Sequence, residues 1–202
     1  MNRHLAIVLV AAAALAAGML LKSQLERPSR TGNPAIDAAN ATALAGDIRV
    51  SFTLPDIDGT LRDSAEWDGK AKLINFWATW CAPCRREIPL LKQAQQDHAG
   101  AGLQVIGIAV DFPEEVAAYA EEAGFNYPVL VGQEDAMAVA ERSGVEFIGL
   151  PFTMVVAPDG QLIKAHIGEI HQEQIDRITA VLAEVSRGKL DVAAARERLG
   201  RL

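Results

Sequence analysis

The hydrophobic pattern indicates where the buried strands of this chain lie. Residues 72–78 and 103–110 are short and almost continuously apolar, which is typical of strands covered on both faces of a sheet. Residues 85–96, between these two segments, are predicted to form a helix. The pattern therefore begins an alternation of strands and helices.

The following segments continue this alternation. Residues 113–123 are predicted to form a helix, because proline stands at its start and Gly124 follows its end. Pro158-Asp159-Gly160 predicts the turn of a terminal hairpin. The other expected elements are strands over 48–54, 129–131, 152–156 and 162–166, helices over 135–142 and around the apolar stripe Ile175, Ile178, Leu182 and Val185, and a short exposed helix in the tail 189–202. This order predicts an α/β fold with a mixed central sheet flanked by helices.

An apolar run near the N-terminus predicts a membrane segment. Residues 5–21 lie between Arg3 and Lys22, and these seventeen residues would span roughly 26 Å as a helix, against ~30 Å for a hydrocarbon core. Snorkelling of the flanking cations covers the difference. Ala14-Leu15-Ala16 also fits a signal-peptide cleavage site, but Met19-Leu20-Leu21 continues the run and favours an uncleaved anchor. The expected organisation is an anchor over 1–22, a linker over 23–46, a folded domain over 47–187 and a tail over 188–202.

Composition narrows the class of protein. Roughly 150 residues follow the N-terminal segments, which is a common size for one domain with its own core. Half of the 202 residues are hydrophobic, enough to build that core. The formal net charge of -7 argues against nucleic acid as a partner.

The chain has only two cysteines, and they stand at the start of the first helix. Cys81 and Cys84 enclose Ala82 and Pro83 directly after the first buried strand. The N-terminus of a helix presents free N–H groups and the positive end of the peptide dipoles. A thiolate of Cys81 is stabilised there, so we expect its pKa to fall below about 8.5. The pattern predicts a redox pair in which Cys81 is the exposed attacking thiol and Cys84 the inner, resolving thiol.

Two structural roles for the cysteine pair fit less well. A zinc site needs four ligands, and the chain offers no other cysteine, with its four histidines scattered at positions 4, 98, 166 and 171. A disulfide that closes so small a loop also removes little entropy from the unfolded chain. With an N-terminal anchor or signal peptide, the cysteine-containing domain is expected outside the cytoplasm. Disulfides persist there, which favours a redox role for the pair.

Three motifs resemble a known family. Residues 77–84, with the sequence Trp-Ala-Thr-Trp-Cys-Ala-Pro-Cys, are similar to the thioredoxin active-site segment. Glu87-Ile88-Pro89 and Gly149-Leu150-Pro151-Phe152-Thr153 resemble the membrane-anchored TlpA/ResA branch of the thioredoxin superfamily, which includes the CcmG/DsbE type. The resemblance covers residues 50–185. It implies a thioredoxin-like fold with an αβ insertion over residues 111–145, and thiol–disulfide oxidoreductase activity.

The resemblance also assigns roles to individual residues. It implies a cis bond between Leu150 and Pro151, which faces the cysteines and offers the backbone at residue 150 to an extended substrate. Thioredoxins usually carry a buried Asp where this chain has Asn75. Glu87, one helical turn after Cys84, is expected to replace it as the acid/base group, with its pKa raised by desolvation. The alternative for Glu87 is a surface pair with Arg85 or Lys92.

The expected site thus has two parts. Its catalytic residues are Cys81, Cys84 and Glu87. Its substrate-binding residues are Trp80, Pro83, Leu150 and Pro151. Trp80 precedes the nucleophile and is expected to shield the disulfide, and Trp77 is expected in the core. The site is expected to need no cofactor and no metal.

The expected activity is dithiol–disulfide exchange by a disulfide reductase. The resemblance implies a single-pass protein of a bacterial inner membrane with a periplasmic domain. It also implies an electron donor of the DsbD/CcdA type and substrates such as apocytochrome c or copper-site proteins of oxidase assembly. Three alternatives stay open: an oxidant or isomerase, a thiol peroxidase of the peroxiredoxin-like group, and a copper chaperone using Cys81, Cys84 and either His166 or His171.

Overall fold

The structure, a computed structural model, describes residues 48–142, 144, 147 and 149–200. The predicted anchor over 1–22, the predicted linker over 23–46 and residue 47 lie outside the described residues. Among the residues that are described, no helix is long and apolar enough to cross a membrane.

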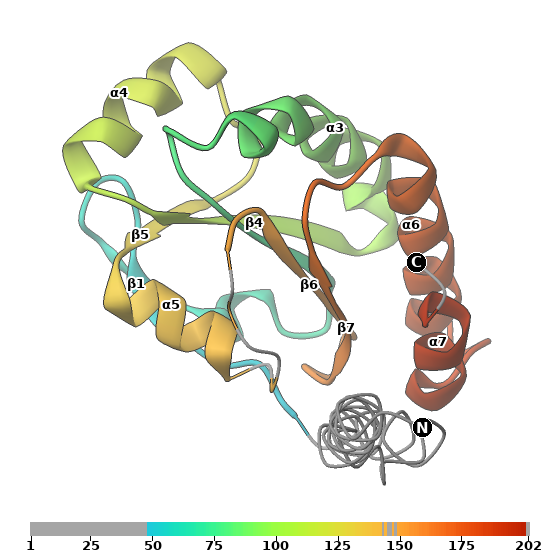
Figure 1. The fold of residues 1–202 in the computed structure, drawn as a ribbon. Helices are drawn as coiled ribbons and strands as arrows, with labels where there is room; N and C mark the ends of the chain where they lie inside the picture. The colour runs from blue at the N-terminus through green and yellow to red at the C-terminus, as the bar shows by residue number, and fades with distance from the viewer. Residues whose placement is uncertain (1–47, 143, 145–146, 148, 201–202) are drawn as a thin grey trace, which may run out of the picture. The chain divides into compact units, whose positions relative to one another are not determined.

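A five-stranded mixed sheet, in the order β5-β4-β3-β6-β7, forms the centre of the domain (Figure 1). β3 (Ala71–Trp77) pairs in parallel with β4 (Leu103–Val110) and antiparallel with β6 (Phe152–Val156). β5 (Val129–Gly132) extends the sheet beyond β4, and β7 (Leu162–Ile167) extends it beyond β6. All seven residues of β3 are buried, as the continuous apolar pattern predicts for a central strand.

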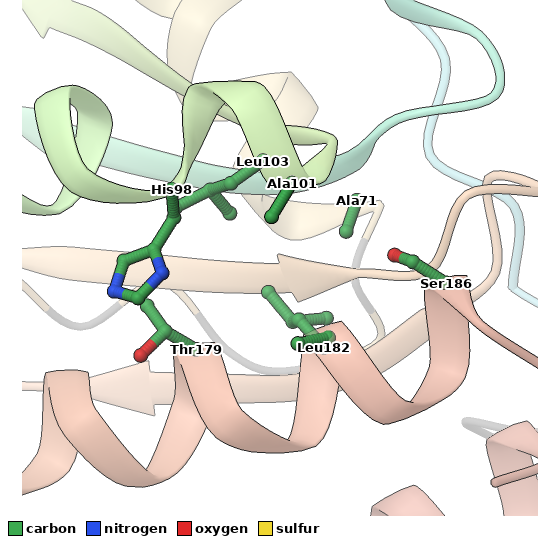
Figure 2. A pocket seen from close by; sticks show the side chains of 8 residues that line it. Ala71, His98, Ala101, Leu103, Thr179, Leu182 and Ser186 are labelled. Carbon is green, nitrogen blue, oxygen red and sulfur yellow. The ribbon is translucent and has the colours of Figure 1, made fainter. Parts of the chain in front are cut away.

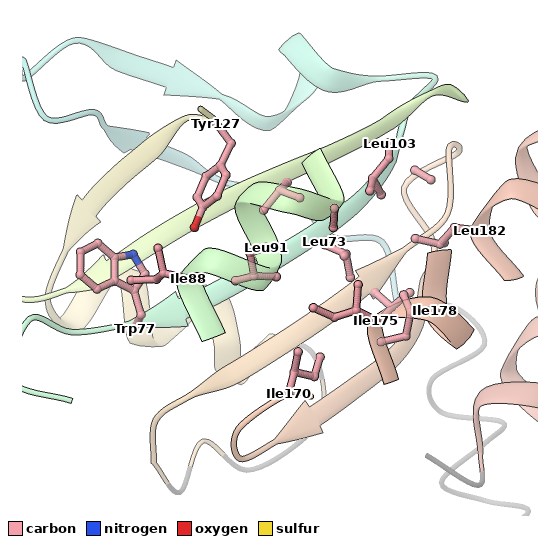
Figure 3. Close-up of a cluster of buried hydrophobic side chains, with 14 of the residues drawn as sticks. Leu73, Trp77, Ile88, Leu91, Leu103, Tyr127, Ile170, Ile175, Ile178 and Leu182 are labelled. Carbon is pink, nitrogen blue, oxygen red and sulfur yellow. The ribbon is translucent and has the colours of Figure 1, made fainter. Parts of the chain in front are cut away.

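Helices cover both faces of this sheet (Figure 1). α3 (Ala82–His98) and α6 (Gln172–Ser186) lie on one face, where Val116 of α4 (Pro113–Ala123) joins the same core. α5 (Glu134–Glu141) lies on the other face. The alternation along β3 separates the two cores, because Leu73 and Trp77 face α3 whereas Ile74 and Phe76 face α5. Figure 3 shows Leu73 among apolar side chains of α3 and α6.

The first strand differs from its prediction. Over residues 48–54 the structure has an isolated bridge between Arg49 and Gln161, and β1 begins only at Thr53. The backbone changes partners within this segment, since Val50 N donates to Gly160 O whereas Phe52 O accepts from Ser64 N. β1 (Thr53–Pro55) then pairs with β2 (Leu61–Asp63), which leads into the 3-10 helix η1 (Ser64–Trp67).

The tail forms a helix that is more buried than predicted. α7 (Val192–Leu199) follows α6, and Ala195 and Leu199 are fully buried in the core that α6 also joins. Arg196 Nε and Nη2 donate to the carbonyl of Leu162 at the start of β7, at 3.0 and 2.8 Å. The prediction of a helix is therefore confirmed, and the prediction that it is exposed is wrong.

The remaining helical elements agree closely with the sequence pattern. α4 has the predicted bounds, with Gly124 in a left-handed conformation at φ 56° directly after it. α3 begins three residues earlier than predicted and ends at His98, followed by the 3-10 turn η2 (Ala99–Ala101). The segment expected to be an insertion contains α4, β5 and α5.

Candidate functional site

Cys81 occupies the N-cap of α3, four residues after the last residue of β3. Its sulfur is bonded to that of Cys84 and also accepts a hydrogen bond from the backbone N–H of Cys84, with a distance of 3.3 Å. Pro83 stands in the first turn, where a missing N–H costs no helical hydrogen bond. The local sequence therefore builds the redox pair at the positive end of a helix, where a Cys81 thiolate is stabilised after reduction.

The two sulfur atoms differ in access to solvent. Cys81 retains 5% of its surface and Cys84 retains none. The prediction of an exposed Cys81 thus needs correction in degree: in this disulfide-bonded state both residues are buried, because the helix and the core close over them. Cys81 is still the more exposed cysteine, as predicted, because Cys84 has no exposed surface for a partner to contact.

Glu87 lies on α3, one turn after Cys84, and is fully buried. Its Oε1 accepts a hydrogen bond from Asn75 Nδ2 at 2.6 Å, and its Oε2 accepts one from the backbone N–H of Ile170 at 2.8 Å. Desolvation raises the pKa of Glu87 to about 7, although the hydrogen bonds from Ile170 and Asn75 act in the opposite direction. The expected rise is confirmed. The alternative of a surface pair with Arg85 or Lys92 is wrong, because the carboxyl group points into the core.

Asn75 connects Glu87 to the neighbouring strand. Its amide nitrogen also donates to Thr153 Oγ1 at 3.0 Å, and the register places Asn75 opposite Thr153 on β6 and Gly107 on β4. All of the amide hydrogens of Asn75 therefore have acceptors. Its Oδ1 has no hydrogen-bond partner among the residues that the structure describes.

The Leu150–Pro151 peptide bond is cis, as the resemblance implies. Phe152 pairs with Phe76 near the end of β3, so Pro151 lies at the same end of the sheet as residues 78–81. Leu150 packs against the core cluster that contains both cysteines. Trp80 has 69% of its surface exposed, whereas Trp77 is buried as expected. Trp80, Cys81, Leu150 and Pro151 thus lie at one end of the sheet.

Asp111 is part of the site, although the sequence analysis gave it no role. It follows β4 and is buried, and its Oδ2 accepts hydrogen bonds from Thr79 N at 2.9 Å and Thr79 Oγ1 at 2.6 Å. Its Oδ1 accepts one from the backbone of Phe112 at 2.9 Å. Asp111 therefore fixes the loop that carries Trp80 and Cys81. In the sequence, Asp111 is only a carboxylate directly after a buried strand. That position does not indicate which residue it would contact.

An ion pair ties α3 to the loop that follows β7. Arg86 Nε donates to Glu169 Oε1 at 3.0 Å, and this contact lowers the pKa of Glu169 and raises that of Arg86. Glu169 immediately precedes Ile170, whose N–H contacts Glu87. The loop over 168–171 is thereby held against α3 at two adjacent points.

The pocket shown in Figure 2 contains none of the predicted site residues. The pocket in Figure 2 lies between the C-terminal end of α3 and α6, lined by His98, Leu103 and Thr179 among others. Its volume of about 10 Å³ holds no more than a water molecule. No group of His, Cys, Asp and Glu side chains that could hold a metal ion occurs in the described part of the chain, so His166 and His171 do not join the cysteines in such a group.

Sequence comparison relates the chain to a family and to curated proteins. Residues 45–165 match the AhpC/TSA family. The thiol–disulfide oxidoreductase ResA of Halalkalibacterium halodurans is 26% identical over 146 residues, covering 72% of this chain and 81% of the relative. ResA of Geobacillus kaustophilus is 29% identical over 138 residues, covering 67% and 77%.

Solved structures show the same fold. A thiol:disulfide interchange protein of the thioredoxin family from Chlorobium tepidum superposes with a TM-score of 0.62 at 30% identity, covering 68% of this chain and 97% of that protein. A secreted Mycobacterium tuberculosis disulfide oxidoreductase homologous to E. coli DsbE superposes with a TM-score of 0.57 at 22% identity, covering 67% and 99%. The predicted thioredoxin-like fold is confirmed by these similarities.

Proposed function

The chain belongs to the AhpC/TSA family of thioredoxin-like proteins and is a thiol–disulfide oxidoreductase, and from this premise we propose that it acts as an extracytoplasmic disulfide reductase through Cys81 and Cys84. One observation carries the proposal. The sulfur of Cys81 lies at the N-terminus of α3, bonded to Cys84 and in contact with the Cys84 N–H. A dithiol held in this position can ionise at one sulfur and close to a disulfide without rearranging the backbone.

The reaction is a two-electron exchange between dithiol and disulfide. The Cys81 thiolate attacks one sulfur of a substrate disulfide, and the other substrate sulfur leaves as a thiolate that takes up a proton. Cys84 then loses its proton and attacks the Cys81 sulfur of the mixed disulfide. The second substrate sulfur leaves as a thiolate and is protonated in turn. The substrate gains two electrons and two protons, and the Cys81–Cys84 disulfide is formed.

Glu87 is the proposed acceptor for the Cys84 proton. The two residues are three positions apart on one helix and therefore neighbours on its surface. With its pKa raised to about 7, the carboxylate is basic enough to accept a proton near neutral pH and acidic enough to return it. Burial supports this role, because no bulk water competes for the proton at Cys84.

Substrate binding is assigned to the surface around Cys81. Trp80 offers an exposed aromatic face directly before the nucleophile, and Pro83 lies partly exposed in the first turn of α3. Leu150 and Pro151 lie at the same end of the sheet, where the backbone at residue 150 can pair with an extended segment of the substrate. These contacts would present the disulfide of a protein substrate to the small accessible surface of Cys81.

The N-terminal sequence and the relatives support a proposed cellular setting. The apolar run over residues 5–21 supports a single-pass anchor in a bacterial inner membrane, and its signal-like start supports a domain in the periplasm. A secreted structural relative supports an extracytoplasmic site of action. A reductase there needs electrons from across the membrane, for which we propose a donor of the DsbD/CcdA type. The proposed substrates are apocytochrome c or copper-site proteins of oxidase assembly.

Covalent trapping tests the proposal. In a Cys84→Ala variant the mixed disulfide on Cys81 cannot be resolved, so substrates should accumulate as complexes that migrate apart after reduction. Cys81→Ala is the matched control and should trap nothing. The complexes are isolated from membrane and periplasmic fractions and their partners identified by mass spectrometry. Equal yields from both variants would exclude exchange through Cys81.

A further inference from the structure

Among the residues that the structure describes, Asn75 is the one side chain that donates a hydrogen bond to the Glu87 carboxylate. It is itself buried, with 1% of its surface exposed, in the middle of the central strand. An amide in such a place costs free energy unless its polar atoms are paired. The two acceptors of its nitrogen, Glu87 Oε1 and Thr153 Oγ1, are both fully buried. The amide nitrogen of Asn75 therefore donates to buried groups, one of them the Glu87 carboxyl, and not to solvent.

From this geometry we propose that Asn75 is a positioning residue that keeps Glu87 ionisable at neutral pH. The inference rests on the proposed role of Glu87 as the proton acceptor for Cys84. A carboxyl group without any exposed surface would otherwise stay protonated, because burial disfavours the charged form. A protonated Glu87 cannot take a proton from Cys84. The amide N–H at 2.6 Å and the Ile170 N–H at 2.8 Å are donors that stabilise the carboxylate.

The second N–H of the Asn75 amide contacts a neighbouring strand. Thr153 stands opposite Asn75 on β6 and accepts this N–H. The same nitrogen thus contacts both Glu87 and β6. On the other neighbour, β4, the register places Gly107 opposite Asn75, and the side chains of Trp77 and Tyr127 border that glycine. Trp77 Nε1 borders the space at Gly107 and, like Asn75 Oδ1, has no hydrogen-bond partner within the described segments.

An aspartate could not take over this task. A second carboxylate at hydrogen-bond distance would repel the charge on Glu87, and the two groups would share one proton. An asparagine instead provides a neutral side chain with two N–H groups that can donate to the carboxylate. This chain thus has an asparagine where thioredoxins usually have an aspartate, and its buried carboxyl group is supplied by Glu87 instead.

Other groups near Glu87 act on its titration and must be held constant. Cys84 lies on the same helix, and Tyr127, which precedes β5, has its own pKa raised by desolvation and by the charge of Glu87. From the loop between β7 and α6, Glu169 raises the pKa of Glu87, with Arg86 as its ion-pair partner. On β7, His166 stands in register with Thr153. None of these groups is changed in the variants below.

The test measures the protonation of Glu87 directly in the oxidised protein, where neither cysteine titrates. NMR of ¹³C-labelled glutamate follows the carboxyl carbon of Glu87, identified by its absence in Glu87→Gln. Asn75→Leu keeps the volume but removes the donor, and we expect the pKa of Glu87 to rise by about one unit or more, the usual worth of a hydrogen bond to a charged group. Thr153→Val is the matched control, because it leaves the donor to Glu87 in place, and its shift should be much smaller.

A second measurement separates positioning from a general structural effect. The pH dependence of mixed-disulfide resolution by Cys84 should move with the pKa of Glu87 in Asn75→Leu, and Asn75→Leu should move nothing further in a Glu87→Gln background. Asn75→Ala is used in the same way if the leucine does not fit. An unchanged Glu87 pKa in the Asn75 variants overturns the inference. If the natural protein reduces no disulfide, the proposed function fails instead, while the titration still decides the role of Asn75.

Discussion

The carboxyl group of Glu87 combines complete burial with hydrogen bonds to both of its oxygens. Burial alone would keep it protonated at any pH near neutrality, and the two donors alone would make it a strong acid. The balance places its pKa at about 7, so both protonation states are populated near neutral pH. In the proposed reaction this residue would accept a proton, and its burial as an ionisable group at the same time reduces the stability of the fold.

This cost predicts a pH dependence of stability. The pKa of Glu87 rises from 4.5 to about 7 on folding, so the folded state binds the proton more tightly than the unfolded state between these values. The free energy of unfolding should therefore fall as the pH rises from 4.5 to 7, by about 3 kcal/mol in total from this one group. Glu87→Gln should remove this contribution and flatten the curve.

Urea denaturation of the two oxidised proteins from pH 4.5 to 8 measures the effect. The difference between the two curves matters rather than either curve alone, because all other titrating groups are shared. Parallel curves would show that the pKa of Glu87 is not raised by folding. The same variant should lose the pH dependence near neutrality of Cys84 reactivity while the fold is retained.

Gly107 offers a second prediction for a single residue. A methyl group there would lie 3.2 Å from Trp77 Nε1 and 3.3 Å from Tyr127 Cε2, which is closer than ordinary packing allows. Gly107→Ala should therefore destabilise the protein by about 1 to 3 kcal/mol, measured by chemical denaturation. Gly100→Ala is the control, because nothing lies within 4 Å of its added methyl, and its effect should stay within about 0.5 kcal/mol.

Among the elements, the loop from β3 to α3 depends on β4 for its position. Asp111 at the end of β4 holds the backbone and the hydroxyl of Thr79, two residues before Cys81. The cysteine pair is thus positioned from two sides, by the start of its own helix and by the end of the neighbouring strand. This contact restrains the motion of Trp80 and Cys81 relative to the sheet.

Asp111→Ala should loosen this loop and destabilise the domain by about 2 to 3 kcal/mol, since a buried charged acceptor with three hydrogen bonds is lost. The rate of exchange with a protein disulfide should fall as well, because Cys81 is no longer held in place. Thr79→Val, which removes only the hydroxyl contact, should show a smaller loss in both measurements. Equal effects of the two variants would mean that the backbone contacts of Asp111 with Thr79 and Phe112 contribute nothing.

At the scale of the whole molecule, the tail closes the core on the side of α6. Leu199 is fully buried although it stands only three residues from the end of the chain. Leu199→Ala should therefore lower the free energy of unfolding by about 2 to 3 kcal/mol. Disulfide exchange by the folded protein should stay unchanged, because α7 packs beside α6 and the start of β7, away from Cys81.

A control for this variant comes from the same helix. Arg198→Ala removes an exposed ion pair with Glu184 and should change stability by no more than about 1 kcal/mol. Both variants are compared by thermal and chemical denaturation of the oxidised protein. A Leu199→Ala protein as stable as the natural one would show that α7 does not belong to the cooperative unit.

The redox pair and most of the strands and helices could be predicted from the sequence, because they depend on residues close together in the chain. Cys81 and Cys84 meet within one helical turn, and the apolar runs of β3 and β4 indicate burial by themselves. The raised pKa of Glu87 could be expected from its place one turn after Cys84, but its hydrogen-bond partners required the tertiary structure: Asn75 and Ile170 approach it from 12 and 83 residues away. The same holds for Asp111, which reaches Thr79 across 32 residues, and for α7. Desolvation and long-range hydrogen bonds are properties of the packed surroundings, which no local pattern contains.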